Sequence, residues 1–124
     1  MAPDDTRNDG RRRQVEDYLP LTPALFHVLL ALTEADAHGY AILKEVASRT
    51  EGRVQLSTGT LYGIVKRLLA DGFVRESVAA STDRRRVYRL TPFGRRVALA
   101  EAERLRDLVM AAQAKRLLTG PAGV

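Results

Sequence analysis

The sequence contains no cysteine and only two histidines, His27 and His38, which lie apart in the chain. The lack of cysteine excludes a disulfide framework and thiolate metal sites, and two isolated histidines do not indicate a metal site either. No apolar run approaches the roughly 20 residues that a membrane span needs. The first 17 residues are polar and charged, without the apolar segment of a secretory signal. We therefore expect a cytoplasmic protein without a metal or cofactor.

Catalytic arrangements are missing as well. The chain has no paired carboxylates with a partner, no nucleophile beside a base, and no phosphate-binding loop followed by Lys-Ser or Lys-Thr. Gly59-Thr60 alone is too little to indicate a nucleotide site. The sequence thus predicts a protein that is not an enzyme.

The residues that are present suffice for one domain with an uneven charge. The chain has 124 residues, of which 45% are hydrophobic, enough for one modest core. The net charge is +5, but residues 53–96 hold ten Lys and Arg against three acids. This basic excess in the middle of the chain is expected of a nucleic-acid surface, although charge alone fits a solvated basic face equally well.

Capping residues and apolar spacing predict three short helices. Thr22-Pro23 has the residue types that begin a helix, and a second helix runs from Tyr40 to about Arg49. Ser57 can cap a third helix, which Asp71-Gly72 ends. Between the second and third helices, Arg53–Leu56 could form a short strand.

Two extended segments and a long helix complete the pattern. Residues 73–78 and 86–90 flank a polar turn and predict a hairpin, with Tyr88 and Leu90 on its core side. Three short helices followed by a hairpin predict a mostly α (α+β) fold, a winged helix-turn-helix domain with a long C-terminal dimerisation helix. In this arrangement the third helix enters the DNA major groove, and the hairpin, or wing, follows the phosphate backbone.

The predicted organisation has four parts. They are a disordered N-terminal arm (1–18), a winged helix-turn-helix DNA-binding domain (19–91), a dimerisation helix (92–118) and a flexible tail (119–124). In the arm, Arg11, Arg12 and Arg13 could touch a DNA backbone, but the acids around them favour an ordinary solvated tail.

The third predicted helix has two different faces. One is apolar, and the opposite one carries Gly59, Gly63, Lys66 and Arg67, flanked by Thr60 and Tyr62. Glycine costs a helix up to about 1 kcal/mol, so a merely solvated face would not favour two of them. The face therefore suggests close approach by a phosphate-rich surface. For Tyr62, a core position is the alternative.

The predicted wing carries three consecutive arginines, Arg84, Arg85 and Arg86. Like charges at a turn repel one another, so a polyanion explains them better than an ordinary soluble loop does.

The last predicted helix is too long for its own domain to cover. Small and apolar residues alternate along it at spacings of four and three, which makes a narrow seam suited to a second copy. Folding back onto its own domain is the alternative. The residues of the predicted dimer surface are Ala98, Ala102, Leu105, Leu108, Val109 and Ala112.

Several motifs resemble the PadR family of transcriptional regulators. They are His38-Gly39-Tyr40, Leu56 to Tyr62, Gly72-Phe73-Val74, and Arg84 to Thr91 followed by Gly94. The resemblance covers about residues 21–118 and is close to the short, single-domain branch. Thr58 stands where the family usually has proline.

The resemblance implies a dimeric repressor that binds a palindromic operator in double-stranded DNA and is released by a small apolar or aromatic effector. Phe26, Leu29, Leu99 and Leu105 could line an effector space, or they could be ordinary core residues. A winged helix that binds protein without DNA is the alternative function. The DNA-binding residues carried over are Ser57, Thr58, Gly59, Thr60, Tyr62, Gly63, Lys66, Arg84, Arg85 and Arg86. Lys66 can reach either a guanine edge or a phosphate.

Overall fold

The computed structural model describes residues 14–77 and 85–119 and has the predicted winged helix-turn-helix fold. Three features of the sequence lie outside these residues: the arm with Arg11, Arg12 and Arg13, for which a solvated tail is favoured over a DNA contact, Arg84 of the wing, and residues 120–124 of the tail. The elements are a 3-10 helix η2 (Val15–Tyr18), α2 (Pro23–Ala31), β1 (Ala37–His38), α3 (Gly39–Arg49), α4 (Thr58–Ala70), β2 (Val74–Glu76), β3 (Val87–Leu90) and α5 (Pro92–Ala114).

Side-chain caps begin the helices where the sequence predicts them. The hydroxyl oxygen of Thr22 accepts the N–H of Leu25 at 3.2 Å, and that of Ser57 accepts the N–H of Thr60 at 3.0 Å. Each cap satisfies one of the backbone donors that a helix start leaves without an intrahelical partner. After α4, Gly72 takes a φ of +78°, a conformation that glycine adopts readily.

The sheet is antiparallel, with the strand order β1-β3-β2. In it Val74 pairs with Leu90, and Ala37 pairs with Tyr88. Residues Arg53–Leu56 do not form the strand that the sequence suggested. The strand that joins the hairpin in the sheet is the two-residue β1. A two-residue strand has no alternation that a sequence pattern could reveal.

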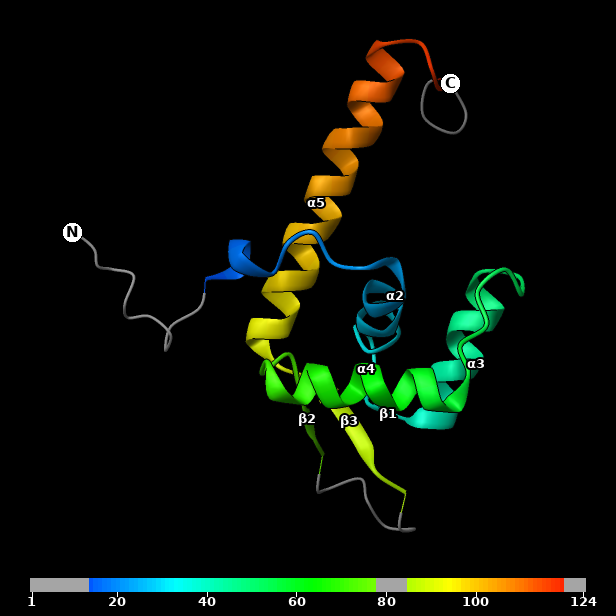
Figure 1. Cartoon of the computed structure of the whole chain (residues 1–124), viewed down its shortest axis with the longest axis vertical. Coiled ribbons are helices and arrows are strands. Elements are labelled where there is room, and N and C mark those ends of the chain that lie inside the picture. Colours follow the sequence, from blue (N-terminus) through cyan, green and yellow to red (C-terminus); the bar gives the residue numbers. More distant parts are fainter. Residues whose placement is uncertain (1–13, 78–84, 120–124) are drawn as a thin grey trace, which may run out of the picture.

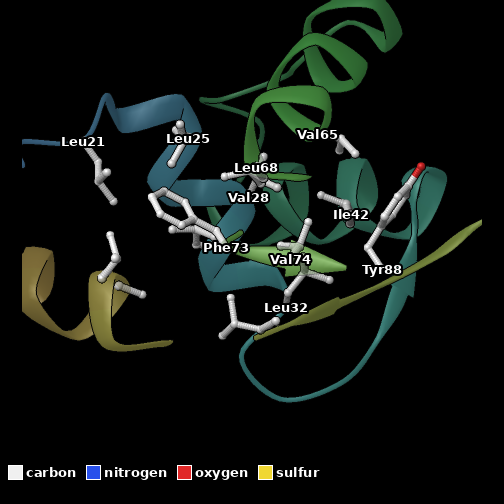
Figure 2. Packing of buried hydrophobic residues seen from close by; sticks show 14 of the residues in the cluster. Leu21, Leu25, Val28, Leu32, Ile42, Val65, Leu68, Phe73, Val74 and Tyr88 are labelled. Atoms are coloured by element: carbon white, nitrogen blue, oxygen red, sulfur yellow. The ribbon is translucent and has the colours of Figure 1, made fainter. Parts of the chain in front are cut away.

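The core lies between the three short helices, the sheet and the first turns of α5 (Figure 2). Leu29, Ile42 and Leu61 come from α2, α3 and α4 and are all fully buried. Tyr88 and Leu90 point inward from β3, as predicted. This packing fixes the angle of α4 relative to the hairpin.

The segment before α2 is more ordered than the predicted arm. Tyr18 packs edge-on against Phe73, with ring centroids 4.9 Å apart, and against Phe93 at 5.8 Å. The backbone N–H of Leu21 donates to the buried carboxylate of Glu101 on α5. The prediction of disorder up to residue 18 is therefore wrong for Val15–Tyr18, because one aromatic side chain anchors an otherwise polar stretch.

Helix α5 projects away from the domain, and the hairpin lies at the opposite end of the molecule (Figure 1). Its first turns pack on α2 and η2. Its 23 residues span about 35 Å at 1.5 Å per residue. The helix ends at Ala114, not near Leu118, because Arg116 takes a φ of +64° and the N–H of Leu117 turns back to the carbonyl of Ala112.

Candidate nucleic-acid interface

Helix α4 separates an apolar face from a polar one. Leu61, Val65 and Leu68 are buried against the core. The predicted contact residues on the other side are all exposed, and four of them follow the i, i+3, i+4, i+7 spacing of one helix face. These four, Gly59, Tyr62, Gly63 and Lys66, are called the outer face of α4 below.

The glycines of the outer face have no role inside the described chain. A Cβ added at Gly59 or Gly63 would meet no atom within 4 Å. Gly94 on α5 is different, because a Cβ there would collide with the backbone carbonyl of Phe73. Packing thus explains Gly94 but neither glycine of the outer face.

The start of α4 presents hydroxyls beside backbone donors. Besides accepting the Thr60 N–H, the Ser57 hydroxyl donates to the Thr60 hydroxyl at 2.9 Å. Ser57 is therefore engaged in capping, while Thr60 keeps a proton that it can donate outward. Thr58 is exposed next to them. Such a helix N-terminus is suited to anions.

Two of the three predicted wing arginines lie in the described chain, and both are exposed. Arg86 pairs with Glu76 on β2 at 2.8 Å, with both side chains well solvated. Exposed pairs of this kind contribute about 0–1 kcal/mol, so Arg86 can exchange its partner at low cost. Arg85 precedes it at the entry to β3.

Tyr62 and Gly39 are fitted to each other. A Cβ on Gly39 would lie 2.5 Å from the Tyr62 hydroxyl oxygen, so Gly39 provides room for that ring. Tyr62 is 48% exposed, which excludes a core position. Gly39 is the first residue of α3 and shows no positive φ, so packing and not backbone conformation explains this glycine. Nδ1 of His38 accepts the N–H of Ala41 and so caps α3.

A hollow of about 400 Å³ lies where α3, α4 and the hairpin meet. We call it the wing-base hollow. It is lined by His38, Gly39 and Tyr40 from the start of α3, by Tyr62, and by Arg85, Arg86 and Tyr88 from the hairpin. Burial, followed by the nearby Tyr62 and Glu76, raises the pKa of Tyr88, so its hydroxyl stays protonated. Figure 2 shows this hydroxyl at the end of the ring that faces away from the apolar cluster.

The structure also locates residues that sequence reasoning did not assign to this surface. Tyr40 lies off the apolar face of α3, is 63% exposed and lines the wing-base hollow. In the sequence, Tyr40 lies outside the apolar pattern of Ile42 and Val46, and this position could have indicated an exposed aromatic side chain.

The predicted dimer surface is only partly free. Ala98 is buried in the core of its own domain, so its assignment to the seam is wrong. The structure leaves Leu105, Leu108 and Val109 36%, 55% and 45% exposed. Ala102 is exposed as well, and Ala112 is half-buried.

The described chain offers neither a metal site nor a membrane-spanning helix. Among residues 14–77 and 85–119, no group of three or more His, Cys, Asp or Glu could hold a metal ion. Within the same ranges, no helix combines the length and apolarity that crossing a membrane would require.

Comparison with known proteins gives a consistent picture. The model of the Transcriptional regulator PadR-like family matches residues 28–100, more than half of the chain. An uncharacterized protein of Lysinibacillus sphaericus is 30% identical over 70 residues, which cover 55% of this chain and 64% of that relative.

Two solved structures share the fold. A PadR family transcription regulator from Clostridium difficile is 21% identical, with a TM-score of 0.61, covering 76% of this chain and 97% of the other. BpsR of Bordetella bronchiseptica, whose DNA binding is regulated by 6-hydroxynicotinic acid, is 23% identical, with a TM-score of 0.58. That match covers 75% of this chain and 65% of BpsR.

Proposed function

We propose that this chain, which belongs to the PadR-like family of transcriptional regulators, acts as a homodimeric repressor that binds a palindromic operator. The outer face of α4 enters the major groove, and the wing follows the backbone. The observation that carries this proposal is the open space around Gly59 and Gly63, which leaves room for a surface from outside the described chain.

The individual contacts follow from the chemistry of the side chains. Thr58 and Thr60 donate to phosphates at the start of α4, and Ser57 holds that helix end in place. Gly59 and Gly63 admit the DNA surface, and Tyr62 and Lys66 contact it. Arg84, Arg85 and Arg86 bind backbone phosphates.

Dimerisation supplies the second recognition helix. Apolar side chains remain exposed on the part of α5 that projects beyond the domain, and a second copy offers the same surface in return. Two copies of α4 would then face half-sites about one DNA turn apart.

A small apolar or aromatic effector would release the operator. BpsR offers a parallel for ligand control on this fold. Among the residues predicted to line an effector space, Leu29 is fully buried in the core, while Leu99 and Leu105 are exposed on α5. An effector would therefore bind against α5, between the subunits.

The wing assignment is tested by replacing Arg84, Arg85 and Arg86 with alanine and titrating DNA by fluorescence anisotropy at several salt concentrations. Each lost phosphate contact should reduce the magnitude of the negative slope of log K against log salt by about 0.9, and affinity should fall for every duplex tested. Arg106→Ala, an exposed arginine on α5, is the charge control. An unchanged slope in the triple variant contradicts the wing assignment. A wild-type protein with no DNA affinity at low salt favours the protein-binding adaptor.

A further inference from the structure

The wing-base hollow lies between the two surfaces that the proposed function places on DNA. Tyr62 belongs both to the outer face of α4 and to the hollow, and Arg85 and Arg86 belong both to the wing and to the hollow. A strand that passes from the recognition helix to the wing must therefore cross it.

The chemistry of the hollow favours an anion. Its lining side chains in the described chain are two arginines, three tyrosines and a histidine, all of which can donate, and none is acidic. Nδ1 of His38 accepts the N–H of Ala41, so the ring keeps its proton on Nε2 as a further donor. Glu76 is the neighbouring acid, and Arg86 pairs with it.

Lys44 extends this donor set along α3, next to Tyr40. Tyr40 is the most exposed of the lining tyrosines, and its ring has no place in the hydrophobic core. Lys44, one turn later, holds its ammonium 5.4 Å from the centre of the Tyr40 ring. This contact keeps a positive charge beside Tyr40, which itself lines the hollow.

Gly39 determines where the Tyr62 hydroxyl lies in the hollow. Because Gly39 lacks a Cβ, the Tyr62 hydroxyl lies directly over the start of α3, at the hollow. The phenol is thus held in place while half of its surface remains accessible.

We propose that the wing-base hollow binds a backbone phosphate of the DNA, with Tyr40, Tyr62 and Arg85 as its ligands and Lys44 as a supporting charge. This inference rests on the proposed function and adds Tyr40 and Lys44 to the DNA surface. The open hollow has room for the phosphodiester together with the adjoining sugar, which favours a DNA strand over a free ion.

The test uses the full chain and a 24-base-pair duplex of arbitrary sequence, because phosphate contacts do not depend on sequence. Tyr40→Phe removes one neutral donor, so affinity should fall about tenfold while the salt slope stays unchanged. Lys44→Gln removes a charge, so the magnitude of the negative salt slope should decrease by about 0.9. Tyr18→Phe and Lys115→Gln are the matched controls, since Tyr18 packs against Phe93 at the start of α5 and Lys115 follows the last residue of that helix.

The outcomes separate this inference from the proposed function. If the Arg84–Arg86 variant loses affinity while Tyr40→Phe and Lys44→Gln bind like the wild type, the hollow does not bind DNA and the proposed function stands. If the wild type binds no DNA, both fail. If phosphorus NMR detects inorganic phosphate in the hollow, but DNA affinity is independent of Tyr40, the ligand is a free anion and the inference is overturned. Both substituted side chains are exposed, so circular dichroism should show unchanged folding.

Discussion

The outer face of α4 and the projecting part of α5 are both exposed helical surface, and they differ in chemistry. The outer face of α4 has glycines, a tyrosine and a lysine. The projecting part of α5 exposes Leu108, Val109 and Met110 by roughly half of their surface. The first surface lacks side chains where packing would allow them, and the second has apolar side chains without partners.

The difference indicates two different partners. Open space above glycines favours close approach by a rigid, charged surface such as DNA, whereas exposed apolar side chains favour burial against other apolar side chains. The two surfaces lie toward opposite ends of the molecule, so one partner does not block the other (Figure 1). A substitution on α4 should therefore weaken DNA binding without changing the dimer, whereas one on α5 should weaken DNA binding only through the loss of the dimer.

The largest effect is expected from Val109→Asp. A carboxylate in the proposed dimer interface costs at least about 2 kcal/mol in each copy, so the dimer dissociation constant should rise about a thousandfold. Sedimentation velocity should then detect monomers at concentrations where the wild type is a dimer. DNA affinity should fall with it, because each monomer offers one recognition helix.

Ala114→Asp is the control for this substitution, since it places the same charge on the opposite side of α5. It should leave the dimer intact. If Val109→Asp remains dimeric as well, the exposed apolar side chains of α5 do not form the dimer interface, and the partner surface lies elsewhere.

A smaller effect is expected at Glu101, where α5 joins its domain. The carboxylate is 2% exposed, binds Arg104 through two hydrogen bonds and accepts the N–H of Leu21. The bond from Arg104, the largest influence, lowers the pKa of Glu101 below its ordinary 4.5. Glu101→Gln should lower the free energy of unfolding by about 2 kcal/mol at neutral pH, as measured by urea denaturation at fixed protein concentration.

The contribution of Glu101 to stability should depend on pH in the direction that its lowered pKa sets. Because the folded pKa is lowered, the stabilisation is present above pH 4.5 and is lost as pH falls through the folded value. The variant and the wild type should therefore converge in acid. Glu103→Gln, at an exposed position of the same helix, should change neither the stability nor its pH profile. If the free energies of unfolding of Glu101→Gln and the wild type differ by the same amount at all pH values, the ionisation of Glu101 does not contribute to stability.

The parts of the fold that repeat a local pattern were predictable from sequence. Thr22 and Ser57 cap helices where their sequence context predicts it, and Tyr88 faces the core as alternation requires. Contacts between distant segments were not predictable. Neither the room that Gly39 provides for Tyr62 nor the anchoring of Tyr18 on Phe73 leaves a periodic signal, because each depends on the packing of separate elements.

The same limit applies to the seam on α5. The spacing that includes Ala98 is correct for one helix face, but the first turns of that face are buried by the chain's own domain. A periodic pattern gives the face of a helix and cannot say which partner covers each part of it.

The smallest effect is also the sharpest test of the comparison, and it comes from Gly63→Ala. Since a Cβ there meets nothing, the substitution should raise the free energy of unfolding by about 0.5–1 kcal/mol through helix propensity alone. Gly94→Ala should do the opposite and destabilise the fold, because its Cβ would collide with the Phe73 carbonyl. Thermal denaturation distinguishes the two glycines.

If the outer face of α4 lies against DNA, the stabilised Gly63→Ala protein should nevertheless bind duplex DNA more weakly than the wild type. Equal or tighter binding would mean that the space above Gly63 stays filled with water in the complex, and the contrast between α4 and α5 would then rest on Tyr62, Lys66 and the wing alone.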